Sequence, residues 1–513
     1  MIGNSWGLVN SDLPNSLSDI QCIAMKKAAE RKKTNHWLIL VLLALAQFMV
    51  ILDVSIVNVA LPAIQHAFRM SQSSLQWIVT AYSLTFGGFL LLGGRNADLF
   101  GRRRTFLIGI SAFTLASLGS GLSQSGGMLI VFRALQGLAG AYMSPAALSI
   151  ILVTYREGHE RNVALSVWGA VASGGAAVGV LAGGIITQYL TWRWNFFVNV
   201  PVGIGVVITA LRILDKHEST AEHNSLDLPG AISVTGGLMM LVYGLVKAPV
   251  EGWTSSGSLW HFGAALALLA LFIYNENRAK HPLMPLGIFR IRNLAGADTL
   301  MLCMAAGLFS VFFFTSLYVQ EVLGYTPVRT GFSFLVVPII IAVVATNVPR
   351  LVQRVGYRPI LIVAPLFVSS GLFWLSHITV NGTYWTNVAP GLILMALGMG
   401  ATFVSVTIAA TSGVPHHEAG LASGLLNTAQ QIGGALGLAV LTGVATSSSM
   451  HYLQNLHLRT APTHELIAAA TVHGFHDGYL IGSTFGLVAS LLAIFVLRPQ
   501  RAKTDPSHGE AAA

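Results

Sequence analysis

The chain has 513 residues, of which 54% are hydrophobic and only 10% are charged, and its mean hydropathy is +0.67. Soluble globular proteins carry roughly 25% charged residues, so this composition excludes a soluble protein and predicts one that crosses the membrane many times. The net charge of +9 would suit a nucleic-acid partner. The Lys and Arg residues are spread over short loops, however, which predicts membrane topology instead and no nucleic-acid partner.

Fourteen apolar runs are long enough to cross a bilayer, which takes about 20 helical residues. With the N-terminus placed inside, 23 of the 29 Lys and Arg residues fall on the inner side, five fall in outer loops, and Arg133 lies within a span. Because basic residues are retained in the cytoplasm, both termini are expected there, and the polar segment 1–36 shows no signal peptide. The expected spans are 37–60, 75–93, 104–122, 127–154, 163–189, 195–213, 229–247, 259–275, 295–322, 331–349, 359–377, 386–411, 419–446 and 478–498.

Asp53 is the main candidate functional residue of the first span. It lies 16 residues after Trp37, the expected start of that span. At about 1.5 Å per residue, this spacing puts the acid in the outer half of a hydrocarbon core of about 30 Å. An aspartate at such a depth costs roughly 2.5 to 3.5 kcal/mol to insert and marks ion or proton pathways. The alternatives are a purely structural pairing residue and a position at the membrane interface, and the depth argues against the second.

The loop between the second and third spans carries a dense motif. Glycines at both ends permit a tight turn, and three arginines follow the second glycine. Asp98 is expected to neutralise the N-terminus of the thirteenth span near Ala419. The pattern closely resembles the cytoplasmic loop motif of the major facilitator superfamily, and a solvated charge run is the alternative. The motif residues are Gly94, Asp98, Gly101, Arg102, Arg103 and Arg104.

Arg133 in the fourth span is the expected partner of Asp53. Both residues lie at similar depths below the outer ends of their spans, so they are expected to pair. Arg133, Gln136 and Gly137 also resemble the second motif of the superfamily, in which the arginine is linked to proton transfer. A purely structural ion pair is the alternative.

A stripe of glycines follows in the fifth span. Gly175, Gly179 and Gly183 recur every four residues and share one helix face, and Gly184 follows directly. Such a face allows another helix to approach closely, and it resembles the antiporter motif of drug exporters. Val180 stands where that motif has proline, so the bend caused by that proline is not expected. Ordinary small-residue packing is the alternative.

The chain looks duplicated. A shift of 255 residues brings Gly101 onto Gly356 and Arg103 onto Arg358, although two other motif positions are replaced. Parallel halves with a substrate site between them are a known transporter architecture. The seventh and eighth spans have no counterpart and are treated as inserted. The expected units are an N-terminal tail (1–36), a six-helix bundle (37–215), the inserted pair (227–276), a second six-helix bundle (290–498) and a C-terminal tail (499–513).

The second half offers weaker candidates. Glu321, near the outer end of the ninth span, is expected to be a snorkelling interface residue, with a second proton site as the alternative. Asp298 and Asp477 are expected at the membrane boundaries. The side-chain amides proposed to line a cavity are those of Gln136 in the fourth span and Asn427, Gln430 and Gln431 in the thirteenth.

No metal site, cofactor or enzymatic reaction is expected. The two cysteines, Cys22 and Cys303, offer no ligand cluster, and the histidines of the expected outer loop 447–477 have no ligand-like spacing. A phosphate-binding loop of the Gly-Lys-Ser/Thr kind is also missing from the sequence. This argues against ATP as the energy source.

The fourteen spans, the inserted pair and the stretch 52–62 around Asp53 resemble the fourteen-span drug:proton antiporter subfamily of the major facilitator superfamily, over roughly residues 37–498. The resemblance implies an all-α polytopic membrane protein with two pseudo-symmetric six-helix bundles and two additional transmembrane helices. It implies proton-coupled efflux of small amphiphilic compounds, such as drugs, by alternating access, with Asp53 in proton coupling. We expect a monomer in the cell membrane. The alternatives are proton-coupled uptake or facilitated transport of a metabolite, and a non-transporting receptor or scaffold.

Overall fold

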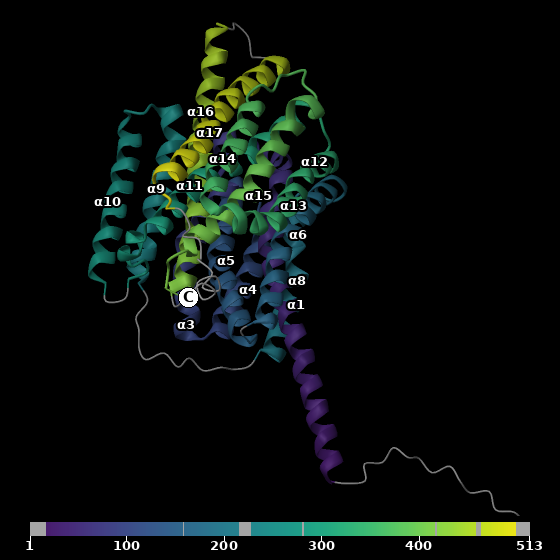
Figure 1. Cartoon of the computed structure of the whole chain (residues 1–513). Coiled ribbons are helices and arrows are strands. Elements are labelled where there is room, and N and C mark those ends of the chain that lie inside the picture. The colour runs from purple at the N-terminus through teal and green to yellow at the C-terminus, as the bar shows by residue number, and fades with distance from the viewer. Residues whose placement is uncertain are drawn as a thin grey trace, which may run out of the picture.

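Helices make up almost all of the computed structural model, which describes residues 17–156, 158–214, 227–279, 282–415, 418–457 and 463–498 (Figure 1). Among these residues, fourteen helical segments are long and apolar enough to cross a membrane, so the predicted fold class and span number are confirmed. The helices are α1 (Leu17–Phe68), α2 (Gln72–Leu75), α3 (Trp77–Phe100), α4 (Arg102–Leu122), α5 (Gly126–Thr154), α6 (His159–Tyr189), α7 (Trp194–Phe197), α8 (Asn199–Ile213), α9 (Leu228–Glu251), α10 (Ser256–Arg278), η1 (Leu286–Arg290), α11 (Arg292–Leu317), η2 (Tyr318–Val322), α12 (Pro327–Phe334), α13 (Val336–Val355), α14 (Tyr357–Leu375), η3 (Tyr384–Val388), α15 (Ala389–Thr411), α16 (Ala419–Asn455) and α17 (His464–Phe495).

Several helices run well beyond the apolar runs that predicted them. Helix α1 begins at Leu17, so residues 17–36 of the expected tail are helical, although the membrane-capable part begins at His36. Helices α16 and α17 extend into the expected outer loop 447–477, most of which is therefore helical. Hydropathy detects only the part of a helix that suits the bilayer, whereas the helical backbone hydrogen bonds continue until a capping residue ends them. At the start of α17, for example, the Thr463 side chain accepts from the Leu466 amide. Residues 1–16, 215–226 and 499–513 of the expected tails and connecting segment lie outside the described residues.

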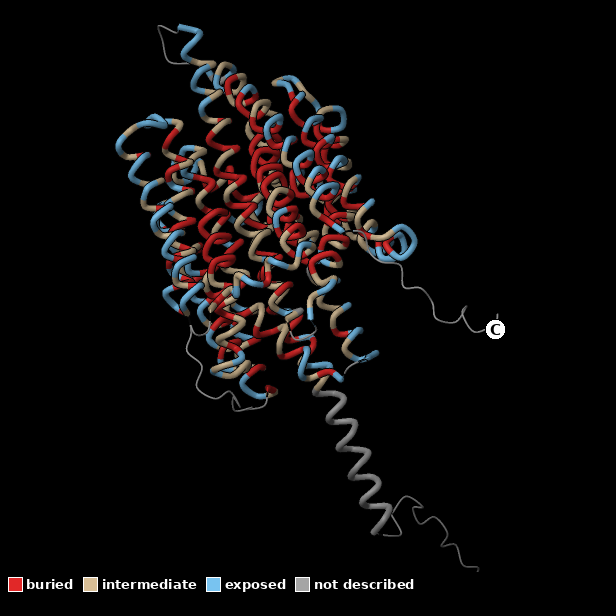
Figure 2. The backbone as a smooth tube through the Cα atoms, turned by 60° about the vertical axis from the view of Figure 1, so that its left-hand side comes forward, coloured by how far each residue is buried: buried red, intermediate tan, exposed pale blue. Residues whose placement is uncertain are grey.

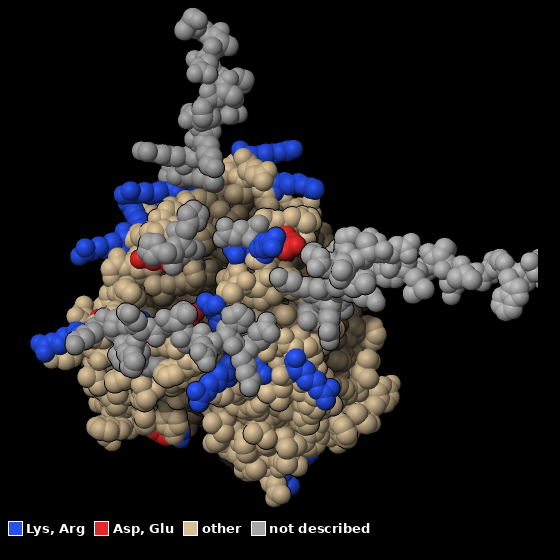
Figure 3. All heavy atoms as spheres, turned by 90° about the horizontal axis from the view of Figure 1, so that it is seen from below, with Lys and Arg blue, Asp and Glu red and all other residues tan. Residues whose placement is uncertain are grey.

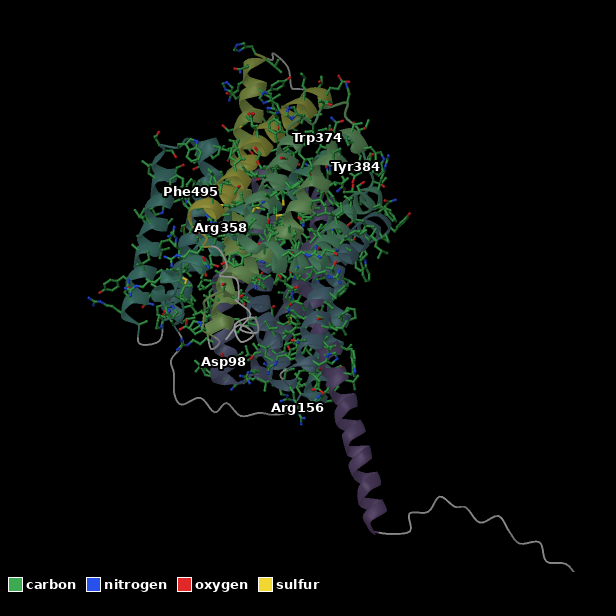
Figure 4. All side chains as sticks on the ribbon, viewed as in Figure 1. Asp98, Arg156, Arg358, Trp374, Tyr384 and Phe495 are labelled. Carbon is green, nitrogen blue, oxygen red and sulfur yellow. The ribbon has the colours of Figure 1, made fainter. Side chains whose placement is uncertain are left out.

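The two ends of the bundle differ in charge. We call the end from which α1 projects the inner end; Asp98 and Arg156 lie there, whereas Trp374 and Tyr384 lie at the opposite, outer end (Figure 4). Figure 3 shows the inner end with many Lys and Arg side chains and few acidic ones. This distribution agrees with the expected basic inner loops.

Each half of the chain turns between its second and third helices on a glycine with a positive φ. Gly101 joins α3 to α4 with φ +95°, and Gly356 joins α13 to α14 with φ +78°. This region of backbone space is open to glycine and strained for most other residues. The pair related by the 255-residue shift therefore has the same conformational role in both halves.

The arginines related by the same shift also make equivalent contacts. Arg103 Nη2 donates to the Leu211 carbonyl at the end of α8 at 3.0 Å, and Arg358 Nη2 donates to the Ile494 carbonyl at the end of α17 at 2.7 Å. A cation near the last carbonyls of a helix satisfies orphan acceptors and favours the helix dipole. In both halves, the third helix is thus tied to the end of the sixth, as duplication predicts.

The buried residues lie in the interior of each half and between the two halves (Figure 2). Helix α9 packs against α3, where a Cβ on Gly88 would lie 2.1 Å from Thr235 Oγ1. Helix α10 lies outside α9, at the edge of the molecule (Figure 1). The α9–α10 pair therefore covers one flank of the bundle.

Candidate proton-coupling site

Asp53 is fully buried, with 0% of its surface exposed. It lies 17 residues after His36 and 15 before Phe68, the two ends of the membrane-capable part of α1. The alternative of an interface position, which the sequence already disfavoured, does not agree with this depth. A carboxylate at this depth needs partners from neighbouring helices.

Arg133 of α5 is the cationic partner. Its Nη1 donates to Asp53 Oδ2 in a buried ion pair, and its Nε donates to the Ile78 carbonyl of α3 at 3.0 Å. The guanidinium carbon also lies 4.4 Å from the centre of the Tyr82 ring, which adds a cation–π contact. The pairing expected from equal depth is present in the structure.

Gln136 lies one turn after Arg133 on α5 and binds both members of the pair. Its Nε2 donates to Asp53 Oδ1 at 2.9 Å and to Ser117 Oγ at 2.7 Å. Its Oε1 accepts from Arg133 Nη1 at 2.9 Å and from Ser120 Oγ at 3.3 Å. Gln136 was expected to line a cavity; it is fully buried here, and its four bonds hold the acid and the arginine instead.

Asn199, at the start of α8, is the partner that the sequence did not predict. Its Nδ2 donates to Asp53 Oδ1 at 3.1 Å, and the residue is buried. An asparagine at the end of a span looks like an ordinary interface residue, so its sequence position gave no direct signal. The packing of α8 against α1 and α4 turns it toward the acid.

Both carboxylate oxygens of Asp53 are therefore satisfied in the charged form. Oδ2 accepts from Arg133, and Oδ1 accepts from Gln136 and Asn199. A proton arriving at Asp53 must displace at least one of these donors, so protonation would rearrange contacts that α1 makes with α5 and α8.

A second contact joins α1 and α5 at the inner end. The Tyr155 hydroxyl, just after α5, donates to the His36 carbonyl. Burial raises the pKa of Tyr155 to about 12, so its hydroxyl keeps its proton at physiological pH. This contact fixes the inner end of α5 on α1 while the ion pair joins the same helices deeper in the membrane.

The glycine stripe of α6 packs on the part of α1 that carries Asp53. A Cβ built on Gly179 would lie 2.6 Å from Ser55 Cβ and 3.2 Å from the Leu52 carbonyl, on either side of the acid. Gly183 is similarly close to the Ile56 carbonyl, at 2.8 Å. The absence of side chains at these positions is therefore what allows α1 and α6 to touch.

Gly184 and Val180 of the same motif face the other half of the protein. A Cβ on Gly184 would lie 2.5 Å from the Pro327 carbonyl of α12, and one on Gly331 of α12 would lie 2.5 Å from the Val180 carbonyl. Helix α6 continues through Val180 from His159 to Tyr189. The helix that contacts the Asp53 segment thus also contacts the second half.

Gly179→Ala is expected to reduce stability and transport. The new methyl would overlap Ser55, and overpacking of this kind costs roughly 1 to 3 kcal/mol. The matched control is Gly169→Ala on the same helix, where a Cβ meets nothing within 4 Å. Thermal unfolding in detergent should give a lower midpoint for Gly179→Ala and an unchanged one for Gly169→Ala. Equal midpoints would contradict the packing assignment.

The loop motif lies at the inner end between α3 and α4. Asp98 is exposed, and its Oδ1 lies 3.7 Å from Arg102 Nη2. A Cβ on Gly94 would lie 3.6 Å from Pro145 of α5, and Arg104 is exposed. The expected action of Asp98 on the N-terminus of α16 stays a prediction.

The other cavity candidates lie on α16. Asn427 is exposed and donates to the Ser423 carbonyl at 3.3 Å, and Gln430 and Gln431 are half-buried. Gln431 packs on α3, since its Cβ is 2.9 Å from the position of a Cβ on Gly87. These residues are separate from the Asp53 network, and their role in a cavity stays a prediction.

The outer end of the interface between the halves is closed by hydrogen bonds to α1. Ser316 Oγ of α11 donates to the Asn58 carbonyl at 2.7 Å, and Gln320 Nε2 of η2 donates to the Val59 carbonyl at 3.0 Å. Both acceptors lie within two turns of Asp53. The segment that carries the acid is therefore also the segment on which the second half closes.

Glu321 adds a third contact at the same end. Its Oε1 lies 2.8 Å from His66 Nε2 at the end of α1, next to a hollow of about 380 Å³ lined by residues of α1, α11 and α17. Sequence analysis expected a snorkelling side chain. That position stays a prediction, and the structure adds a partner for Glu321 from the other half.

The fold and the buried ion pair together define a polytopic helical membrane protein of the secondary-transporter kind, with two halves that meet across the membrane. A family model of the Major Facilitator Superfamily matches residues 43–438. The chain belongs to this superfamily.

Its relatives include resistance and export proteins of actinobacteria. The puromycin resistance protein pur8 of Streptomyces alboniger is 39% identical, over 92% of this chain and 93% of that protein. The cephamycin export protein CmcT of Amycolatopsis lactamdurans is 37% identical, over 83% and 89%, and the lincomycin resistance protein of Streptomyces lincolnensis is 32% identical, over 95% and 97%. These similarities support the predicted class of drug exporters.

Solved structures agree on the fold. A bacterial homolog of the human lysosomal transporter Spinster has a TM-score of 0.64 and 15% identity, and the match covers 90% of this chain and 97% of that one. The xylose transporter XylE from E. coli has a TM-score of 0.59 and 14% identity over 91% of this chain and 98% of that one. At such identities the likeness concerns the architecture alone.

Proposed function

We propose that this protein exports small amphiphilic compounds in exchange for protons, with Asp53 as the proton-binding group. One observation carries the proposal: a fully buried carboxylate on α1 whose two oxygens are held by donors from α5 and α8. A purely structural role would not require a buried ion pair here, because apolar residues can often replace such a pair without loss of stability. A group that binds and releases protons must remain ionisable.

The contacts of α1 supply a route from proton binding to a change of shape. Protonation of Asp53 from the outer side would cancel its charge and weaken its hold on Arg133. Helix α1 also accepts bonds from Ser316 and Gln320 of the second half and is packed against the α6 glycines. A shift of α1 would therefore alter the outer closure, and deprotonation toward the cytoplasm would restore it, which is alternating access.

The substrate class is inferred from the relatives, which are named for puromycin, cephamycin and lincomycin. We place the protein in the cell membrane with both termini in the cytoplasm, because basic residues gather at the inner end (Figure 3). It would work as a monomer, without catalytic chemistry. Each half-to-half contact described above is made within one chain.

A resistance assay tests the direction of transport. A susceptible host that expresses the chain should tolerate a higher concentration of at least one of puromycin, cephamycin and lincomycin, and should accumulate less of it than the same host with the empty vector. Unchanged tolerance and accumulation for all three would contradict export of this substrate class.

Proton exchange is tested separately in inside-out vesicles with an acid interior. Addition of the protective compound should partly collapse the preformed pH gradient, because each molecule taken in is exchanged for protons. Vesicles without the chain provide the control. An uptake symporter would not protect the host, and a receptor or scaffold would leave the gradient unchanged.

A further inference from the structure

Asp298 is a second deeply buried acid, in the second half of the chain. It lies in α11 with 7% of its surface exposed, and both of its carboxyl oxygens are buried without a hydrogen-bond partner among the described residues. Sequence analysis placed this residue at the membrane boundary. Asp298 lies six residues after the start of α11, so the boundary position stays a prediction; the structure adds that protein encloses the side chain.

The surroundings of Asp298 are the opposite of those of Asp53. Asp53 has an arginine and two amides on its oxygens, whereas no described residue donates to either oxygen of Asp298. An ionised carboxylate that is removed from water without a donor or a cation is strongly disfavoured relative to the neutral acid. The geometry of Asp298 therefore fits a carboxyl group that carries its own proton.

Helix packing shows what encloses it. Leu302 and Ala306, one and two turns after Asp298, form the close contact of α11 with α16: a Cβ on Gly433 would lie 2.3 Å from the Leu302 carbonyl, and one on Gly437 would lie 2.2 Å from Ala306 Cα. Residues at this spacing share a helix face. Asp298 thus continues the α16-facing stripe of α11 toward the inner end.

The inner end of α11 lies a short way from Asp298 along the helix. Asp298 is six residues after Arg292, where α11 begins, or roughly 9 Å at 1.5 Å per residue. The outer end of the same helix is closed against α1 by Ser316. Release from Asp298 would therefore be directed to the inner end.

The basic groups on elements packed around the inner part of α11 are directed elsewhere. Arg292 Nη2 donates to the Phe495 carbonyl of α17, and Arg358 of α14 donates to the Ile494 carbonyl. Arg290 of η1 is exposed, and so is Arg498, which follows α17 and binds Asn293 of α11 through its backbone amide. Helix α15 contains no Lys, Arg, His, Asp or Glu.

The titratable groups of the other neighbouring helices lie toward the outer end or are already paired. On α1, Asp53 pairs with Arg133 and His66 pairs with Glu321 of η2. The groups that lie toward the outer end are His451 on α16 and His464, Glu465, His473, His476 and Asp477 on α17. Among the described residues, no cation is therefore recorded that would hold Asp298 ionised.

We propose that Asp298 is a second proton-binding site, which holds a proton in the outward-closed state seen here and releases it to the cytoplasm when the α11–α16 contact loosens. The step is a simple dissociation: the carboxyl O–H bond breaks, the electron pair stays on the carboxylate, and the proton passes to water. Its use in exchange rests on the proposed function, and it would add one proton to each transport cycle. The presence of the proton on Asp298 does not depend on that function.

Infrared difference spectroscopy of the purified full-length protein in lipid nanodiscs tests the site without a substrate. The spectrum of the wild type minus that of Asp298→Asn at neutral pH should contain the carbonyl band of one protonated carboxyl group, which is well separated from carboxylate bands. Asp298→Leu should remove the same band, and it provides a variant that introduces no unpaired amide. Asp53→Asn, the matched acid in the first half, should leave the band in place.

Raising the pH should decrease the Asp298 band reversibly, as the proton leaves. Absence of the band in the wild type would overturn the proposal, and so would a band that stays constant as the pH is raised. Failure of the proposed function would appear differently: drug tolerance would be unchanged by the protein, or Asp53→Asn would export normally, in either case with the Asp298 band intact.

Discussion

Asp53→Asn is expected to abolish proton-driven export while leaving the protein folded in the membrane. Asparagine has nearly the shape of aspartate and can still accept from Arg133, but it cannot bind and release a proton. The substitution mimics the protonated state, through which the transport cycle must pass, so the protein should still fold, although with some loss of stability because Arg133 loses its anionic partner. Export should fall to the level of membranes that lack the chain, at every external pH.

The measurement is drug accumulation in cells together with collapse of a preformed pH gradient in vesicles. Glu251→Gln serves as the matched control, because Glu251 is an exposed acid paired with Lys247 at 3.0 Å, and such pairs contribute little. That variant should export normally. Full proton-driven export by Asp53→Asn would remove Asp53 from the coupling mechanism.

Arg133→Met is expected to cause the largest loss of stability of any single substitution in the site. It removes the cation from Asp53 and leaves a buried acid with only the Gln136 and Asn199 donors. Breaking a buried ion pair by removing one partner costs roughly 3 to 5 kcal/mol. The contacts with Ile78 and Tyr82 are lost as well.

A double-substitution cycle separates the ion pair from the loss of packing. Asp53→Asn combined with Arg133→Met should be more stable than Arg133→Met alone, because no buried charge is left without its partner. Arg156→Met, at an exposed position at the inner end (Figure 4), should shift the unfolding midpoint little. If the double variant were no more stable than Arg133→Met, the ion pair would not be the source of the effect.

The candidate site was partly predictable from the sequence, and the parts that were not share one cause. Equal depth in two spans was enough to pair Asp53 with Arg133, because depth depends on position along the chain. Asn199 and Gln136 completed the site through the rotation of α8 and α5 about their own axes. A list of apolar runs contains no information about that rotation.

Asp298 illustrates the same limit in the second half. Its position near the start of α11 suggested a boundary residue, since polar residues are common where a span meets the lipid headgroups. It is nevertheless buried, on a helix whose next two turns pack closely on α16 at glycines more than 100 residues further along the chain. Such a contact is visible only when both helices are placed.

The sequence by itself determined that the chain is an all-helical membrane protein with fourteen spans, duplicated halves and basic inner loops, because these features are local sums of hydropathy and charge. Tertiary structure alone decided which faces of the helices meet: the α6 glycines on the Asp53 segment, Ser316 and Gln320 on the carbonyls of α1, and the α16 glycines on Leu302 and Ala306 of α11. The bilayer fixes how deep a residue lies, whereas the direction in which its side chain points is fixed by packing against all the other helices.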